Sequence, residues 1–110
     1  MDKIVFSCSG CSDLGQIADL TARAMSQKGI RKMHCLAAIG AFPGDSVPYY
    51  SHSDILVLDG CSVSCGKILL QKTGLENIQS VLLTDLGYTK GKTPVSGEIV
   101  EEILKKVATL

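Results

Sequence analysis

Tryptophan is absent from the sequence, and only 5% of the residues are aromatic. This composition argues against a stacking surface for single-stranded nucleic acid, because such surfaces present several aromatic side chains to the bases. An excess of charge of one sign is also lacking, since eleven basic residues are balanced by eleven acidic ones. No net field draws the chain toward a phosphate backbone, so we expect no nucleic-acid partner.

The sequence also lacks an apolar run of about 18–20 residues, the length needed to cross a bilayer. Its start, Met1 to Phe6, leads directly into a strand-like segment without the long apolar stretch or the cleavage site of a signal peptide. We therefore expect a cytoplasmic protein with no membrane partner. In that reducing compartment, five cysteines favour metal binding or redox chemistry over structural disulfides.

What the sequence does contain is an alternation of strand-like and helix-like segments. A chain of 110 residues with 45% hydrophobic residues is expected to form one domain, spanning residues 1–110. The residue patterns predict strands at 3–7, 32–38, 54–58 and 78–84. They predict helices at 13–28, from Ser62 or Ser64 to 72, and from Ser96 onward, with loops at about 40–52 and 87–94.

Such an alternation predicts a three-layer, Rossmann-like α/β fold, in which helices cover both faces of a parallel sheet. If the first helix packs on one face and the second on the other, the four strands take the order 2-1-3-4. The direction of the chain then reverses between strands 1 and 3. At such a switch point a crevice opens at the carboxyl ends of the strands, where open α/β sheets place their sites.

The cysteines are placed to meet at this crevice. Cys8 and Cys11 follow the first predicted strand, whereas Cys61 and Cys65 follow the third. Two intervening residues are a common metal-ligand spacing, and three at a helix start place both sulfurs on one helical face. Cys35, late in the second predicted strand, can also reach the crevice. Cys11 and Cys35 remain open between a ligand role and that of a small buried residue.

Zinc is the metal that best suits this set of residues. Thiolates are soft ligands, and a tetrahedral zinc site needs four of them. Amide groups at a helix N-terminus carry partial positive charge, which favours thiolates there. Asp59 and Ser62 flank Cys61 and are candidates for hydrogen bonds that orient the ligands.

Other polar residues are weaker candidates. In a strand, His34 is expected to face away from Cys35 and to be packed or on the surface. His52 is a reserve ligand, although a solvated loop histidine is the commoner case. Asp85 follows the fourth strand and is expected to cap the next loop. Tyr49 and Tyr50 are expected to cover the edge of the site or to pack against the sheet.

Several motifs together resemble one family. They include Cys8-Ser9-Gly10, Gly15-Gln16, Cys35-Leu36-Ala37-Ala38-Ile39-Gly40, Asp59-Gly60-Cys61 followed by Cys65, and Leu83-Thr84-Asp85-Leu86-Gly87. The combination, over nearly the whole chain, resembles the DGC-domain family, for which zinc binding is inferred from a pattern of cysteines. The resemblance implies a four-cysteine site at Cys8, Cys35, Cys61 and Cys65. Spacing favours Cys11 as the fourth ligand, whereas the resemblance favours Cys35, which we prefer.

The same residues bear on several competing functions. The phosphate loop of low-molecular-weight tyrosine phosphatases needs an arginine six positions after the nucleophile, but position 14 is leucine. Neither a G-x-G-x-x-G motif nor a P-loop is present. Thiol redox or persulfide-carrying chemistry at Cys8/Cys11 and Cys61/Cys65 is the main alternative. No acid–base pair or nucleophile–histidine arrangement points to a hydrolase, so a binding role in structure, metal handling or sensing is favoured over catalysis.

Overall fold

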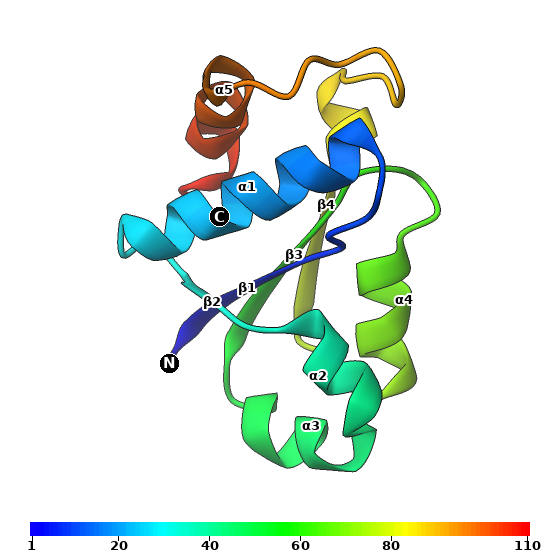
Figure 1. Cartoon of the computed structure of the whole chain (residues 1–110). Helices are drawn as coiled ribbons and strands as arrows, with labels where there is room; N and C mark the ends of the chain where they lie inside the picture. The colour runs from blue at the N-terminus through cyan, green and yellow to red at the C-terminus, as the bar shows by residue number, and fades with distance from the viewer.

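The computed structural model describes residues 1–110 and contains one four-stranded parallel sheet with helices on both faces (Figure 1). The strand order is β2-β1-β3-β4, and every pairing is parallel. The predicted fold class and strand order are therefore confirmed. The elements in chain order are β1 (Lys3–Ser7), α1 (Asp13–Gln27), β2 (Lys32–Met33), α2 (Leu36–Ala41), α3 (Pro43–Tyr50), β3 (Asp54–Asp59), α4 (Cys65–Lys72), β4 (Ile78–Leu82), the 3₁₀ turn η1 (Leu83–Leu86) and α5 (Gly97–Val107).

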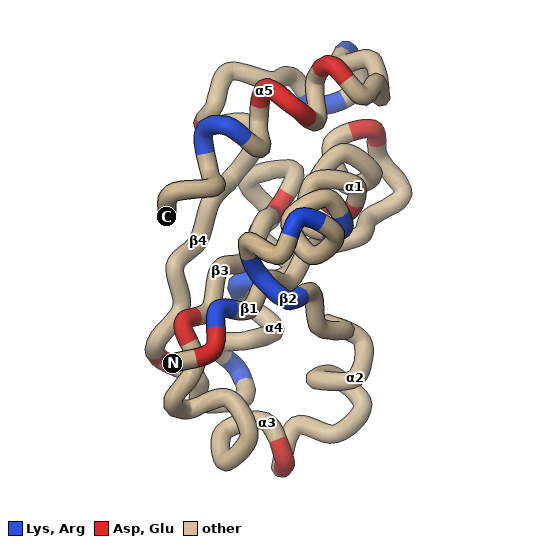
Figure 2. The backbone as a smooth tube through the Cα atoms, turned by 90° about the vertical axis from the view of Figure 1, so that its left-hand side faces the viewer, with Lys and Arg blue, Asp and Glu red and all other residues tan.

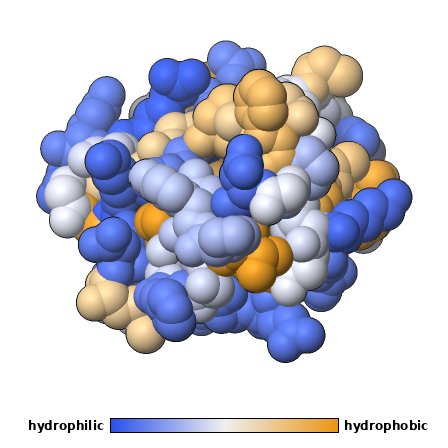
Figure 3. Space-filling model, turned by 90° about the horizontal axis from the view of Figure 1, so that it is seen from below, coloured by the Kyte–Doolittle hydropathy of each residue, from blue (hydrophilic) through white to orange (hydrophobic).

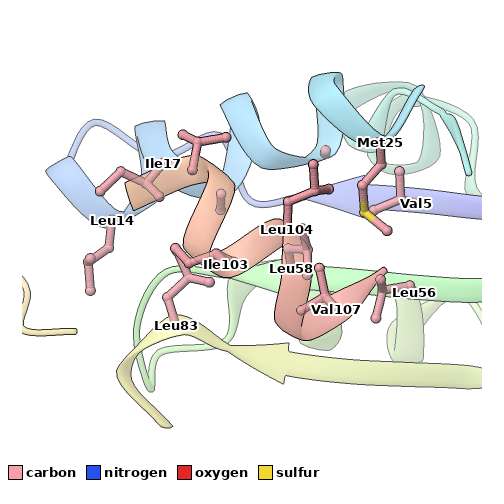
Figure 4. Close-up of a cluster of buried hydrophobic side chains, with 13 residues drawn as sticks. Val5, Leu14, Ile17, Met25, Leu56, Leu58, Leu83, Ile103, Leu104 and Val107 are labelled. Carbon is pink, nitrogen blue, oxygen red and sulfur yellow. The ribbon is translucent and has the colours of Figure 1, made fainter. Parts of the chain in front are cut away.

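Two hydrophobic cores lie on opposite faces of the sheet. Helices α1 and α5 pack on one face, while α2 and α4 pack on the other, with α3 beyond α2 (Figure 1). Because successive side chains of a strand point to opposite faces, Leu56 and Leu58 enter the first core and Ile55 and Val57 the second. The first core is shown in Figure 4. Burial on both faces explains why β3 is a continuous apolar run.

The ends of α1 follow from local chemistry. The hydroxyl of Ser12 accepts a hydrogen bond from the backbone N–H of Gly15 at 3.1 Å and so caps the first turn. At the other end Gly29 has a φ of 70°, a left-handed conformation that suits glycine. Ser96 caps α5 in the same way, accepting from Ile99 N–H at 3.2 Å. These starts and stops agree with the predicted ones.

The prediction was wrong for the segment between the second and third strands. The strand expected at 32–38 has only two residues, Lys32–Met33, and the expected loop at 40–52 is largely helical. The segment Leu36–Ala41 contains three alanines and one leucine, which are strong helix formers, and it buries Ile39 against the sheet. Pro43 begins α3, a position where its missing N–H is not needed.

The fourth strand is also shorter than predicted. It ends at Leu82 instead of residue 84, and the chain turns into η1. The side chain of Leu83 is fully buried in the core beneath α1 and α5, which requires this turn. The residues after it, Thr84 and Asp85, favour turns over strands.

The charged residues do not fall into long runs of one sign along the chain. Basic and acidic residues are interspersed along the chain in Figure 2. Seen from below, hydrophilic atoms dominate and hydrophobic groups appear as separate areas (Figure 3). None of the helices combines the length and the apolar character that crossing a membrane requires.

Candidate functional site

A cysteine-lined cavity lies where β1 and β3 end. These strands are neighbours in the sheet, but their following helices, α1 and α4, cover opposite faces, which makes this the switch point of the fold. The cavity has a volume of about 240 Å³. Four thiols line it, those of Cys8, Cys11, Cys61 and Cys65. Hereafter it is called the thiol cavity.

The loop between β1 and α1 supplies Cys8 and Cys11. The backbone N–H of Cys8 donates to the carbonyl of Leu58 at 3.0 Å, so the pairing of β1 with β3 continues past Ser7. Ser9 then has a φ of 47°, which turns the chain away from the sheet. Cys11 immediately precedes Ser12, the capping residue of α1. The loop therefore returns both thiols to the carboxyl edge of the sheet.

Asp59 organises the loop that supplies Cys61 and Cys65. Its carboxylate is buried and accepts hydrogen bonds from the backbone N–H groups of Gly66 at 2.8 Å and Lys67 at 3.1 Å. The first turn of α4 is thus capped by a residue of β3, and Cys65 is the first residue of that helix. Ser64 stands at the position of the cap, but its φ is 58° and its hydroxyl makes no capping bond. The expected serine cap is wrong, because Asp59 already satisfies these donors.

Gly60 brings the two loops into contact. Its backbone N–H donates to the sulfur of Cys8 at 3.3 Å, which links the β3–α4 loop directly to the first thiol. A Cβ at position 60 would lie 2.8 Å from the carbonyl carbon of Leu14 and 2.9 Å from the nitrogen of Gly15. These are backbone atoms, so they cannot swing aside. The Asp-Gly-Cys sequence therefore combines a helix cap, a close backbone approach and a cavity thiol.

Replacing Gly60 with alanine is expected to lower the free energy of unfolding by about 1–3 kcal/mol, because the new Cβ pushes the β3–α4 loop away from α1. Chemical denaturation followed by circular dichroism measures this loss. Gly10→Ala is the matched control, since a Cβ at position 10 meets nothing within 4 Å. We expect that variant to stay within about 0.5 kcal/mol of the parent. Equal losses in both variants would contradict the proposed close packing.

Lys90 borders the thiol cavity, and the sequence alone did not predict this position. The ammonium nitrogen of Lys90 lies 3.7 Å from the sulfur of Cys61. Its loop is held by the carboxylate of Asp13, which accepts from the backbone N–H groups of Gly91 at 2.9 Å and Thr93 at 3.0 Å. These bonds hold the pKa of Asp13 below its ordinary value. The segment at 87–94 had been expected to be a surface turn, and no local sequence signal links it to the cysteines.

Cys35 lies beside the thiol cavity, not in its lining. It precedes α2 instead of ending a strand, and it lines a second cavity of about 610 Å³. Cys8 lines both cavities. His34 also lines the second cavity, so the expected alternation with Cys35 fails because the strand has already ended.

The remaining candidates lie outside the thiol cavity. His34 is packed, as expected: its Nδ1 is hydrogen-bonded to the hydroxyl of Tyr50 at 2.9 Å, and burial lowers its pKa. The ring of Tyr50 packs against Phe6 of β1, with the centroids 5.5 Å apart. His52 is exposed before β3, at the end of that strand opposite to the site. Asp85 is exposed in η1 and makes no side-chain hydrogen bond.

The cysteines that line the thiol cavity are among the residues that zinc prefers as ligands. Four thiols form the soft donor set of a closed zinc site, so the residues fit that metal by their chemistry. In this structure, no three histidine, cysteine, aspartate or glutamate side chains are already arranged as metal ligands. Cys11 and Cys65 are exposed, and their χ1 angles can take other staggered rotamers.

Fold and site together define a class, that of parallel α/β domains with a cysteine-lined cavity at the switch point of the sheet. The chain belongs to the DGC-domain family, whose model matches residues 4–107. It is similar to the "anaerobic and virulence modulator AnvM" of Pseudomonas aeruginosa, with 33% identity over 92 residues that cover 79% of this chain and 67% of the relative. No solved structure matches the chain.

Proposed function

We propose that this domain binds one zinc ion through cysteine thiolates at the switch point of the sheet. The observation that carries the proposal is the convergence of four thiols, from loops more than 40 residues apart, on one cavity. Cys8, Cys61 and Cys65 are the three ligands on which spacing and family resemblance agree. The amide of Gly60 and the ammonium group of Lys90 lie against two of these sulfurs and complement the negative charge of bound thiolates.

The fourth ligand is Cys11 or Cys35. The lining of the thiol cavity supports Cys11, which needs no movement of the backbone to enter it. The family resemblance supports Cys35, whose thiol lines the neighbouring cavity together with Cys8. As a ligand, Cys35 would have to enter the thiol cavity from the segment between a two-residue strand and a short helix.

Four thiolates fill a tetrahedral zinc and leave no position for water, which supports structural, metal-handling or sensing roles over hydrolysis. The relative AnvM is named as a modulator, and this supports a regulatory use of the site. Bound zinc would supply cross-linking of the β1–α1 loop to the β3–α4 loop. The chain's own contribution is to hold these loops together through Gly60 and Asp59.

Zinc binding is tested on anaerobically purified protein. We expect metal analysis to find about one zinc per chain, and thiol titration to find about four thiols that become reactive only after chelation. The variants Cys11→Ser and Cys35→Ser serve as controls for each other: the one that is not a ligand keeps full zinc stoichiometry. Metal-free protein with five reactive thiols would overturn the proposal.

Thiol redox chemistry is the second candidate, because Cys8 and Cys11 line one cavity two residues apart in a strand–helix loop. This function predicts metal-free protein in which a Cys8–Cys11 disulfide forms readily under mild oxidation. Peptide mass mapping of the oxidised protein identifies that disulfide. Retained zinc with Cys8 protected from oxidation would speak against it.

A further inference from the structure

The second cavity, here called the Cys35 cavity, is larger than the thiol cavity and chemically different. Its volume is about 610 Å³, and it lies beside the end of β1, on the side where β2 has already stopped. Its lining combines a basic side chain paired with the carboxylate of Asp19, the polar residues Ser7, Ser9 and His34, two cysteines and an apolar wall. The apolar wall is formed by Met33, Leu36, Ala37 and Leu69.

The basic side chain is that of Arg23, and a chain of hydrogen bonds fixes its position. Its Nε donates to Asp19 at 2.7 Å, the other carboxylate oxygen of Asp19 accepts from the hydroxyl of Ser9 at 2.9 Å, and Ser9 is bonded to Ser7 at 2.9 Å. The two terminal nitrogens of Arg23 have no partner within the protein, and 62% of its side chain is exposed. A guanidinium held by its Nε and free at its terminal nitrogens suits a ligand carboxylate.

The thiol available to a ligand in this cavity is that of Cys35. It is exposed, whereas Cys8 is half-buried and already accepts a hydrogen bond from Gly60. Arg23 and the accessible thiol of Cys35 therefore line the same cavity, together with apolar side chains. A molecule that fits this arrangement has sulfur at one end and a carboxylate at the other.

We propose that the Cys35 cavity binds small anionic disulfides, and that Cys35 exchanges with them. The thiolate of Cys35 attacks one sulfur of the bound disulfide, a new S–S bond forms to Cys35, and the original S–S bond breaks. The second half leaves as a thiolate and takes up the proton that Cys35 released. The disulfide is the oxidant, so no other reactant is needed. This activity needs a Cys35 thiol that is not bound to zinc, so it requires either Cys11 as the fourth zinc ligand or metal-free protein.

The test uses oxidised glutathione, which carries carboxylates, and cystamine, a disulfide with amino groups in their place. Reduced, chelator-treated full-length protein is mixed with each reagent, and mass mapping follows the rate of modification at Cys35. We expect Arg23→Gln to slow the reaction with oxidised glutathione by about three- to tenfold, because the variant loses one exposed hydrogen bond to a charged group. The rate with cystamine, which has no carboxylate, should not fall. Arg23→Lys should lie between the parent and Arg23→Gln, since it keeps the charge and loses the fork.

Two controls separate ligand recognition from general charge effects. Lys28→Gln removes a positive charge from the same helix, where Lys28 pairs with Glu101 outside the cavity, and it should leave the ratio of the two rates unchanged. In Arg23→Gln the carboxylate of Asp19 loses its partner and could itself repel an anionic disulfide. The double variant Asp19→Asn/Arg23→Gln removes this carboxylate, and we expect its reaction with oxidised glutathione to remain slow. Modification of another cysteine before Cys35, or a rate ratio that Arg23→Gln leaves unchanged, would overturn the proposal. Zinc stoichiometry is measured separately, so failure of either proposal is recognised independently.

Discussion

Asp59→Asn is expected to lower the free energy of unfolding by about 2–3 kcal/mol, because it weakens two charge-assisted hydrogen bonds in a buried place. The carboxylate accepts from the backbone N–H groups of Gly66 and Lys67, and the side chain is only 1% exposed. An asparagine keeps the shape but has one acceptor oxygen, and its amide group would face a backbone donor. At least one N–H at the start of α4 is then left without a partner.

The same substitution is expected to weaken zinc binding by about tenfold or more, as the loss of outer-shell support does in other metal sites. Cys65 is the first residue of α4, so loosening this turn disorders a proposed ligand. Denaturation curves and competition with a chelator measure the two effects. Asp85→Asn, which changes an exposed aspartate at the end of the neighbouring strand, should alter neither. A stable Asp59→Asn variant with parental zinc affinity would show that the cap does not organise the site.

Arg31→Met is expected to cost more, about 3–5 kcal/mol, because the loss of a fully buried guanidinium leaves several backbone carbonyl oxygens without a partner, at about 1–3 kcal/mol for each one that is buried. The side chain of Arg31 is fully buried and forms a salt bridge with Asp54 at 3.0 Å. Its guanidinium also donates to the carbonyl oxygens of Ile4, Asp54 and Leu110. One side chain thus joins the starts of β1 and β3 to the segment that follows α5, and its loss leaves several acceptors unsatisfied in the interior.

Thermal and urea denaturation of Arg31→Met give this loss directly. Lys32→Met is the matched control, since it removes a positive charge from the next residue, which is exposed. We expect it to stay within about 0.5 kcal/mol of the parent. If the two methionine variants unfold at the same denaturant concentration, the buried network is not the source of stability that its geometry indicates.

The parallel sheet could be predicted from the alternation of elements, since residues 55–58 are apolar throughout and amphipathic segments lie on either side of them. The order of the strands followed once the first two predicted helices were assigned to opposite faces of the sheet. The segment 32–52 could not be predicted in the same way. Its apolar run is short, and periodicity alone does not distinguish a buried strand from a short helix; in the fold, Ile39 and Tyr50 pack against the sheet.

The convergence of Cys8, Cys61 and Cys65 could be predicted from the ends of neighbouring strands, but their surroundings could not. Lys90 reaches Cys61 because Asp13, far away in the sequence, binds the backbone of its loop. Arg31 is one basic residue among eleven, and nothing in its neighbours marks it as buried. Contacts of this kind depend on the assembled fold, and no spacing rule encodes them.

Cys8 lines both the thiol cavity and the Cys35 cavity, so it is in contact with the contents of each. Thermodynamic reciprocity then governs any two occupants. Whatever factor zinc imposes on the affinity for a small molecule next door, that small molecule imposes on the affinity for zinc. The residue that follows β1 therefore couples the affinity for a metal ion to the affinity for a small molecule.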